Sequence, residues 1–151
     1  MAKVGIVIGS KTDEELIKPA LEILEQLGIE YDLSIISAHR NPEKAREFAI
    51  KAKSTGFEVI IAAAGAAAHL PGVLASWTTL PVIGIPLPTS ELKGIDSLYS
   101  IVQMPSGVPV ACVGVGTSGA KNAALLAAQI LGTKSPDIQK AFELYKHKLS
   151  Q

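Results

Sequence analysis

The sequence predicts an α/β domain of three layers, in which helices cover both faces of a five-stranded parallel sheet. Five short apolar runs, rich in Val and Ile, are separated by segments whose apolar residues have helical spacing. Apolar runs without polar alternation are typical of strands that are buried on both faces. A chain of 151 residues, 48% hydrophobic and 19% charged, is long enough for one such domain with its own core.

The first strand is expected at residues 4–8, followed by a turn at 9–11. Thr12-Asp13-Glu14-Glu15 then matches a capping box, which predicts that a helix begins there. Gly28 is suited to end this helix. Pro19 lies inside the segment, so it should kink the first turns or place the true start of the helix later.

The second strand is expected at residues 31–36, with Ser37-Ala38-His39-Arg40 as the loop after it. Asn41-Pro42 then supplies an N-cap and a proline in the first turn of a second helix. Three more strands follow at 57–63, 81–85 and 109–115. They alternate with loops at 65–72 and 86–94 and with helices at 73–78, 95–102 and 120–131, the last of which is apolar nearly all round and therefore expected to be buried.

Strands that alternate with helices in this way form parallel sheets with right-handed crossovers. At this length the flavodoxin-like strand order, 2-1-3-4-5, is the commonest solution. Ligands of such sheets bind beyond the carboxyl ends of the strands. The loops at residues 9–13, 37–40 and 64–72 follow three neighbouring strands, so we expect them to converge on one site.

The tail is not needed to cover a five-stranded sheet. Ser135-Pro136-Asp137 predicts the start of one more helix, with apolar residues on one stripe at Ile138, Phe142, Tyr145 and Leu149. We therefore divide the chain into a main domain at 1–132 and a helical extension at 133–151. The extension either packs on its own domain or lies against a neighbouring subunit.

Composition excludes several classes of protein. Lys plus Arg equals Asp plus Glu at 14 each, so no overall field attracts the chain to nucleic acid or an anionic membrane. The single Cys112 excludes an internal disulfide and a cysteine-based metal cluster. No signal peptide precedes the first strand and no apolar run reaches spanning length, so we expect a cytoplasmic protein without a membrane segment.

Two of the converging loops carry polar side chains suited to a phosphorylated ligand. Ser10, Thr12 and Asp13 lie at a helix N-terminus, where free N–H groups and the helix dipole favour a phosphate. Asp13 can accept hydrogen bonds from a ribose diol; alternatively, Thr12 and Asp13 only cap the helix. His39 and Arg40 stand side by side in the second loop, where Arg40 can bind phosphate through two bonds and His39 can give and take a proton.

The stretch at residues 62–72, which contains the third loop, has mostly Ala and Gly. Such a loop lets backbone N–H groups approach a flat ligand closely, although alanine also serves close helix packing. His69 within it is either a second site residue or a buried, satisfied histidine. Gly114-Val115-Gly116-Thr117-Ser118-Gly119 matches a dinucleotide-binding pattern, but only weakly because it follows the last strand rather than the first.

These motifs together resemble the N5-carboxyaminoimidazole ribonucleotide mutase family, the catalytic subunit of phosphoribosylaminoimidazole carboxylase. The resemblance covers about residues 3 to 131 and is carried by Gly9-Ser10-x-Thr12-Asp13, Ser37-Ala38-His39-Arg40, Ala67-Ala68-His69-Leu70-Pro71-Gly72, the segment at 96–109 and Lys121-Asn122-Ala123. The chain departs from the family pattern at Thr12, where the family usually has Ser, and at Ala63 and Ala66, where it often has Gly.

The resemblance implies a transfer of carboxylate from the exocyclic nitrogen of an imidazole ribonucleotide to its ring carbon, without ATP, metal or organic cofactor. It implies His39 as the catalytic acid and base. It implies substrate contacts at Ser10, Thr12, Asp13, Ser37 and Arg40, with the small-residue loop of Gly65, Ala66, His69 and Leu70 closing over the base. It also implies a homo-octamer in which the C-terminal helix reaches a neighbouring subunit.

Two other functions remain as alternatives. A related branch of the family carboxylates aminoimidazole ribonucleotide directly with free carbon dioxide. A non-catalytic receiver or flavin-binding module of the same fold is the more distant possibility. The third strand ends in Ala63-Ala64-Gly65 without an acidic residue, which disfavours a phosphoacceptor receiver.

Overall fold

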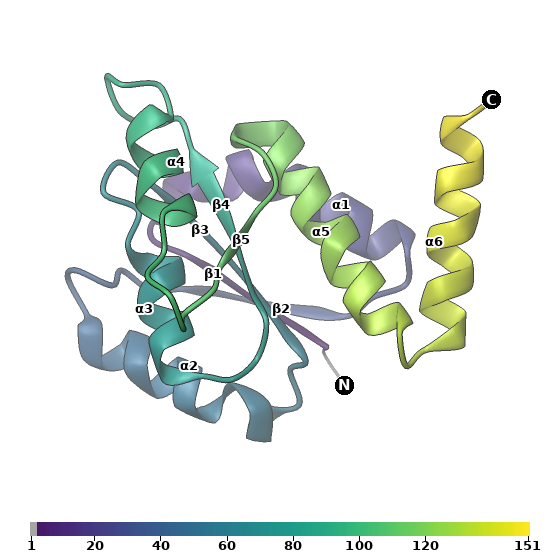
Figure 1. Cartoon of the computed structure of the whole chain (residues 1–151), viewed down its shortest axis with the longest axis horizontal. Helices are drawn as coiled ribbons and strands as arrows, with labels where there is room; N and C mark the ends of the chain where they lie inside the picture. The colour runs from purple at the N-terminus through teal and green to yellow at the C-terminus, as the bar shows by residue number, and fades with distance from the viewer. Residues whose placement is uncertain (1–2) are drawn as a thin grey trace.

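The computed structural model describes residues 3–151. Its sheet has five parallel strands in the order β2-β1-β3-β4-β5, as predicted. The strands are β1 (Val4–Ile8), β2 (Tyr31–Ile35), β3 (Val59–Gly65), β4 (Val82–Leu87) and β5 (Ala111–Cys112). Helices α1 (Glu14–Gln26), α5 (Gly116–Gly132) and α6 (Pro136–Leu149) lie on one side of the sheet, and α2 (Pro42–Thr55), α3 (Leu70–Trp77) and α4 (Ile95–Val102) lie on the other (Figure 1).

The three central strands are buried on both faces, which explains their unbroken apolar sequence. Alternate side chains point to opposite sides because the strand period is two residues. Ile6, Ile61 and Ile83 pack under α1 and α5. Val7 and Ile60, from the intervening positions, pack with α2 and α3.

On the face of the sheet covered by α2, α3 and α4, side chains pack closely over glycines of the strands. A Cβ at Gly5 would lie 2.8 Å from the Phe57 ring, and a Cβ at Gly84 would lie 2.5 Å from Ile101 Cγ2. Ala45, Ala49 and Ala52 form the buried stripe of α2. Small residues on both surfaces therefore bring these helices close to the strands.

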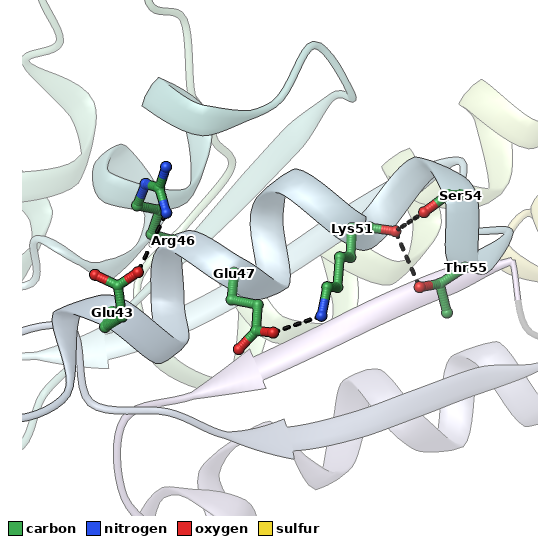
Figure 2. A network of polar contacts seen from close by, with 6 residues as sticks. All are labelled: Glu43, Arg46, Glu47, Lys51, Ser54 and Thr55. Atoms are coloured by element: carbon green, nitrogen blue, oxygen red, sulfur yellow. Dashed lines mark hydrogen bonds and ion pairs between the residues drawn. The ribbon is translucent and has the colours of Figure 1, made fainter.

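The outer face of α2 is polar and braced along its length (Figure 2). Arg46 pairs with Glu43 at 3.2 Å and Lys51 pairs with Glu47 at 2.5 Å, both at helical spacing. The Asn41 side chain accepts a hydrogen bond from the Lys44 N–H, as expected of the predicted N-cap. Arg46 also lies 4.7 Å from the ring centroid of Trp77, which joins α2 to the end of α3.

The start of the first helix differs from the prediction. Residues Lys11–Asp13 form a 3₁₀ turn, and α1 begins only at Glu14. Thr12, the N-cap of the predicted capping box, lies inside the 3₁₀ turn instead, and Asp13, which precedes α1, makes no side-chain capping bond, so the box does not form. Helix α1 continues through Pro19, whose missing N–H removes the hydrogen bond that would reach the carbonyl of Glu15, an exposed residue.

Several other boundaries differ from expectation. Strands β3 and β4 end two residues later than predicted, at Gly65 and Leu87. Helix α3 begins at Leu70 rather than Val73, because Pro71 occupies its first turn. Strand β5 contains only two residues. Helix α5 begins at Gly116, and its exposed Lys121, Asn122 and Gln129 show that it is buried on one face only.

The extension forms one helix on the outside of α5 (Figure 1). The Ser135 side chain caps α6 by accepting from the Ile138 N–H. Ile138, Phe142 and Tyr145 pack against the core under α5, yet no residue of α6 is fully buried. Leu149, the last member of the predicted stripe, is 67% exposed. None of the helices within residues 3–151 has the length and apolarity needed to cross a membrane.

Candidate active site

A hollow of about 350 Å³ lies beyond the carboxyl ends of β1, β2, β3 and β4. The three predicted loops converge there. All ten candidate residues line it: Ser10, Thr12, Asp13, Ser37, His39, Arg40, Gly65, Ala66, His69 and Leu70. Thr89, from the loop after β4, also lines the hollow and was not among the candidates. The order of the strands places the end of β4 beside the end of β3, which is the signal that could have identified it.

The loop after β1 presents hydroxyl groups and one secluded carboxylate. Ser10 Oγ lies 3.0 Å from Thr12 Oγ1 and accepts a weak hydrogen bond from the Thr12 N–H at 3.4 Å. Asp13 is only 8% exposed. Burial raises the pKa of the Asp13 carboxyl above its ordinary value, against a smaller lowering effect of a hydrogen bond with the Ser10 backbone. The Asp13 carboxylate is therefore buried at a cost in desolvation, and it does not cap the helix.

The loop after β2 is folded back on itself and displays Arg40. Ser37 Oγ accepts a hydrogen bond from the Arg40 N–H at 3.3 Å, and the Asn41 N–H donates to the Ser37 carbonyl at 2.8 Å. The Arg40 side chain is exposed. It forms no ion pair with any residue that the structure describes. Its guanidinium is therefore available for an anion.

His39 and His69 meet across the hollow, although 30 positions separate them in the sequence. Nε2 of His39 lies 2.9 Å from Nδ1 of His69, and the rings are nearly perpendicular at 86°. A hydrogen bond between two imidazole nitrogens requires a hydrogen on one and a free lone pair on the other. One hydrogen therefore lies between the two nitrogens, and the tautomers of the rings decide which of them donates it. This contact was not predicted. His69 is exposed, so it is not the buried histidine of the alternative interpretation.

The loop after β3 adopts a backbone that favours glycine. Ala66 has φ of 52°, in the left-handed region that L-residues with a Cβ seldom adopt. Gly65 lets the Thr89 side chain lie close to the backbone, because a Cβ at position 65 would collide with Thr89 Oγ1. The His69 N–H donates to the Ala67 carbonyl at 2.8 Å, and the His69 carbonyl accepts from Val73 at 2.9 Å. These bonds fix His69 at the start of α3.

Within residues 3–151, no three His, Cys, Asp or Glu side chains gather in a way that could hold a metal ion. The Gly114–Gly119 segment does not line the hollow. Its glycines serve the backbone instead, because Gly114 and Gly116 have positive φ and a Cβ at Gly119 would collide with the Gly114 carbonyl.

Comparison with known proteins matches this arrangement to one family. The family model described as AIR carboxylase matches residues 3–151. A Thermotoga maritima protein named N5-carboxyaminoimidazole ribonucleotide mutase is 54% identical over 151 residues, covering all of this chain and 87% of that protein. A Pyrococcus horikoshii protein of the same name is 57% identical over 142 residues, covering 94% of this chain and 79% of its own length.

A solved structure agrees with the fold over the whole chain. The crystal structure of Treponema denticola PurE superimposes with a TM-score of 0.89 at 29% identity, covering 100% of this chain and 93% of that one. The agreement includes residues 133–151, so the additional helix is part of the shared architecture.

Proposed function

Since the chain belongs to the AIR carboxylase family, we propose that it converts N5-carboxyaminoimidazole ribonucleotide to 4-carboxy-5-aminoimidazole ribonucleotide in purine biosynthesis. Relatives of that name align with nearly the whole chain at about half identity. The observation that carries the proposal within the molecule is the His39–His69 pair, set beside anion-binding groups in one hollow. Such an arrangement suits proton transfer on an anchored nucleotide.

The sugar and phosphate would be held on the β1–β2 side of the hollow. Arg40 supplies a charged, two-pronged donor for phosphate. Ser10, Thr12 and Ser37 supply hydroxyls, and Asp13 can accept from the ribose diol. Because none of these groups reacts, their role is to position the base over the histidines.

The chemistry requires two proton transfers, one from His39 and one back to it. Protonated His39 gives its proton to the exocyclic nitrogen, the carbamate C–N bond breaks, and its electron pair stays on nitrogen as carbon dioxide is released. The electron-rich ring carbon then attacks carbon dioxide and forms the new C–C bond. Neutral His39 removes the surplus proton from that carbon, which restores the aromatic ring. Acid–base help of this kind contributes about 10²–10⁴-fold.

His69 would orient His39 and share its proton. The 2.9 Å contact joins Nδ1 of His69 to Nε2 of His39, so the ring that gives the proton and later takes one back is held in place. Positioned in this way, one imidazole serves both steps without a cofactor.

Carbon dioxide carries no net charge, so it must be retained by enclosure and by backbone N–H groups. Gly65, Ala66 and Leu70 line the part of the hollow suited to this role. Retaining the fragment makes recapture intramolecular, which is worth up to roughly 7–11 kcal/mol relative to capture from solution.

We also propose that the protein is a cytoplasmic homo-octamer in which α6 contacts a neighbouring subunit. Two surfaces support association of copies of the chain. Helix α6 has no fully buried residue and exposes Leu144 and Leu149. Helix α4 exposes Ile95, Tyr99 and Val102. Neither apolar surface suits an isolated subunit. Light scattering of the full chain measures the assembly.

An ultraviolet assay for the carboxylated product tests the proposed reaction. The N-carboxylated nucleotide is supplied without ATP or added metal, and formation of the C-carboxylated nucleotide is expected. A parallel reaction with aminoimidazole ribonucleotide and bicarbonate tests the direct carboxylation. Faster turnover in the second reaction than in the first would assign the chain to the carboxylase branch instead.

A further inference from the structure

We infer that Thr89 is a substrate-contact residue, whose hydroxyl donates a hydrogen bond to the carboxylate that is transferred. This inference rests on the proposed function and adds a group that recognises the carboxylate. Thr89 follows β4 and lines the same hollow as the histidine pair. Its hydroxyl makes no hydrogen bond with any residue of 3–151. An available donor at the wall of this hollow is suited to a ligand.

The position of the Thr89 hydroxyl is defined by the absence of a side chain at Gly65. In the register of β3 and β4, Gly65 pairs with Leu87, so Thr89 folds back over the last residue of the neighbouring strand. A Cβ at Gly65 would collide with Thr89 Oγ1 and would lie 3.0 Å from Thr89 Cβ. Glycine at position 65 therefore leaves the space that the threonine hydroxyl occupies.

The segment around Thr89 is held at several points. The Thr89 N–H donates to the Leu87 carbonyl at 3.0 Å. The next residue, Ser90, donates through its hydroxyl to Asp96 Oδ2 at 2.5 Å and accepts from the Leu92 N–H at 3.1 Å. The loop is thus tied to α4 directly beside Thr89. A donor on a braced segment loses little conformational entropy when it binds a ligand.

The order of the strands indicates which part of the substrate Thr89 meets. Arg40 follows β2, and β2 and β4 are three strand positions apart. At about 4.8 Å per strand spacing, this separation is roughly 14 Å. The phosphate anchored at Arg40 therefore lies at one end of the hollow, and Thr89 lies at the end that receives the base and its carboxylate. A neutral hydroxyl can donate a hydrogen bond to the carboxylate and can also tolerate neutral carbon dioxide in the same place. A fixed cation would favour the carboxylate over carbon dioxide.

Binding measurements with two nucleotides separate a carboxylate contact from a general effect. Calorimetry compares the C-carboxylated product with aminoimidazole ribonucleotide, which lacks the carboxylate, for the unmodified chain and for Thr89→Val. Valine keeps the shape of threonine and removes the hydroxyl. A hydrogen bond to a charged group predicts a loss of roughly 10- to 100-fold in affinity for the carboxylated nucleotide only. Thr89→Ser, which restores the hydroxyl, should recover most of that loss.

Thr79→Val is the matched control, because Thr79 precedes the opposite end of β4 and does not line the hollow. It should bind both nucleotides as the unmodified chain does. Equal losses for both nucleotides in Thr89→Val, or no loss for either, would overturn the carboxylate contact. Failure of the unmodified chain to bind the carboxylated nucleotide would instead overturn the proposed function, and the inference with it.

Discussion

The interior of the sheet and its carboxyl edge are built from different kinds of residue. Along β1, β3 and β4 the side chains are apolar and almost fully inaccessible. The loops at the carboxyl edge, after β1, β2, β3 and β4, carry exposed or unpartnered polar groups, including His39, Arg40, His69 and Thr89. They also include Ala66 in a left-handed conformation and the secluded carboxylate of Asp13. Stability is therefore expected to reside in the strands, and strain and reactivity in the loops.

The largest expected effect is on turnover, from a change at the edge. His39→Asn removes the group that gives and takes the proton, so kcat should fall by about 10²–10⁴-fold. The exposed position of His39 predicts an unchanged fold. Steady-state assays measure the first effect and thermal unfolding measures the second. Near-normal turnover would remove His39 from the mechanism.

A change in the interior should lower stability and leave turnover unchanged. Ile61 is completely buried between β1, α1 and α5, so Ile61→Ala leaves a cavity and should lower the free energy of unfolding by about 2–5 kcal/mol. Urea unfolding measures the loss. The fraction of the protein that remains folded should keep its kcat, because Ile61 belongs to the core and does not line the hollow. A parallel loss of kcat would show that the two regions are not independent.

Arg40→Ala tests whether the edge separates binding from chemistry. Loss of a charge-assisted contact to phosphate should weaken nucleotide binding by roughly 10- to 100-fold. The proton-transfer step should be little affected once the substrate is bound, so KM should rise while kcat changes little. If the variant binds normally and turns over slowly, Arg40 has a role in the chemical step instead.

Asp13→Asn should raise the stability of the fold and lower the affinity for the nucleotide. Burial raises the pKa of Asp13 in the folded state, so folding loses stability as the pH rises from the ordinary pKa of a carboxyl to that raised pKa, and the full cost remains above it. The variant is therefore expected to be more stable than the unmodified chain at pH 7, and the difference should shrink as the pH falls toward the ordinary range of a carboxyl. Unfolding at several pH values measures this trend.

Affinity for the nucleotide should fall in Asp13→Asn at the same time, because an amide has one acceptor oxygen in place of two. A variant that is less stable at pH 7 would instead indicate that the carboxylate supports the loop around it. Calorimetry on Asp13→Asn provides the comparison.

Local patterns were sufficient to predict most of the interior. Residues 4–8 and 95–102 form the expected strand and helix with the expected ends, and Asn41 caps α2. The fifth strand was predicted too long, because its apolar run lies at the sheet edge and ends at Gly114, whose φ is 139°. Apolar spacing reports burial, whereas strand length at an edge depends on which backbone groups find a partner.

The edge was predictable only as far as topology determines it. Strand order is enough to bring the loops carrying Ser10, His39 and Gly65 together. The His39–His69 contact and the return of Thr89 over Gly65 depend on side-chain directions and on the path of a loop, which residue spacing does not specify. The resemblance therefore predicted the site residues, but not the contacts between them.

The smallest expected effect concerns the strained loop. Ala66 has φ of 52°, a conformation that costs an L-residue roughly 1–2 kcal/mol and glycine much less. Glycine also gains flexibility in the unfolded chain, which offsets about 0.4–1 kcal/mol of that relief. Ala66→Gly should therefore raise the free energy of unfolding by no more than about 1 kcal/mol, measurable by urea unfolding. Ala67→Gly is the matched control, because Ala67 is a neighbouring exposed alanine without positive φ, and it should be destabilising. If both variants lose stability equally, the left-handed backbone at position 66 carries no strain, and the contrast between a relaxed interior and a strained edge does not extend to this loop.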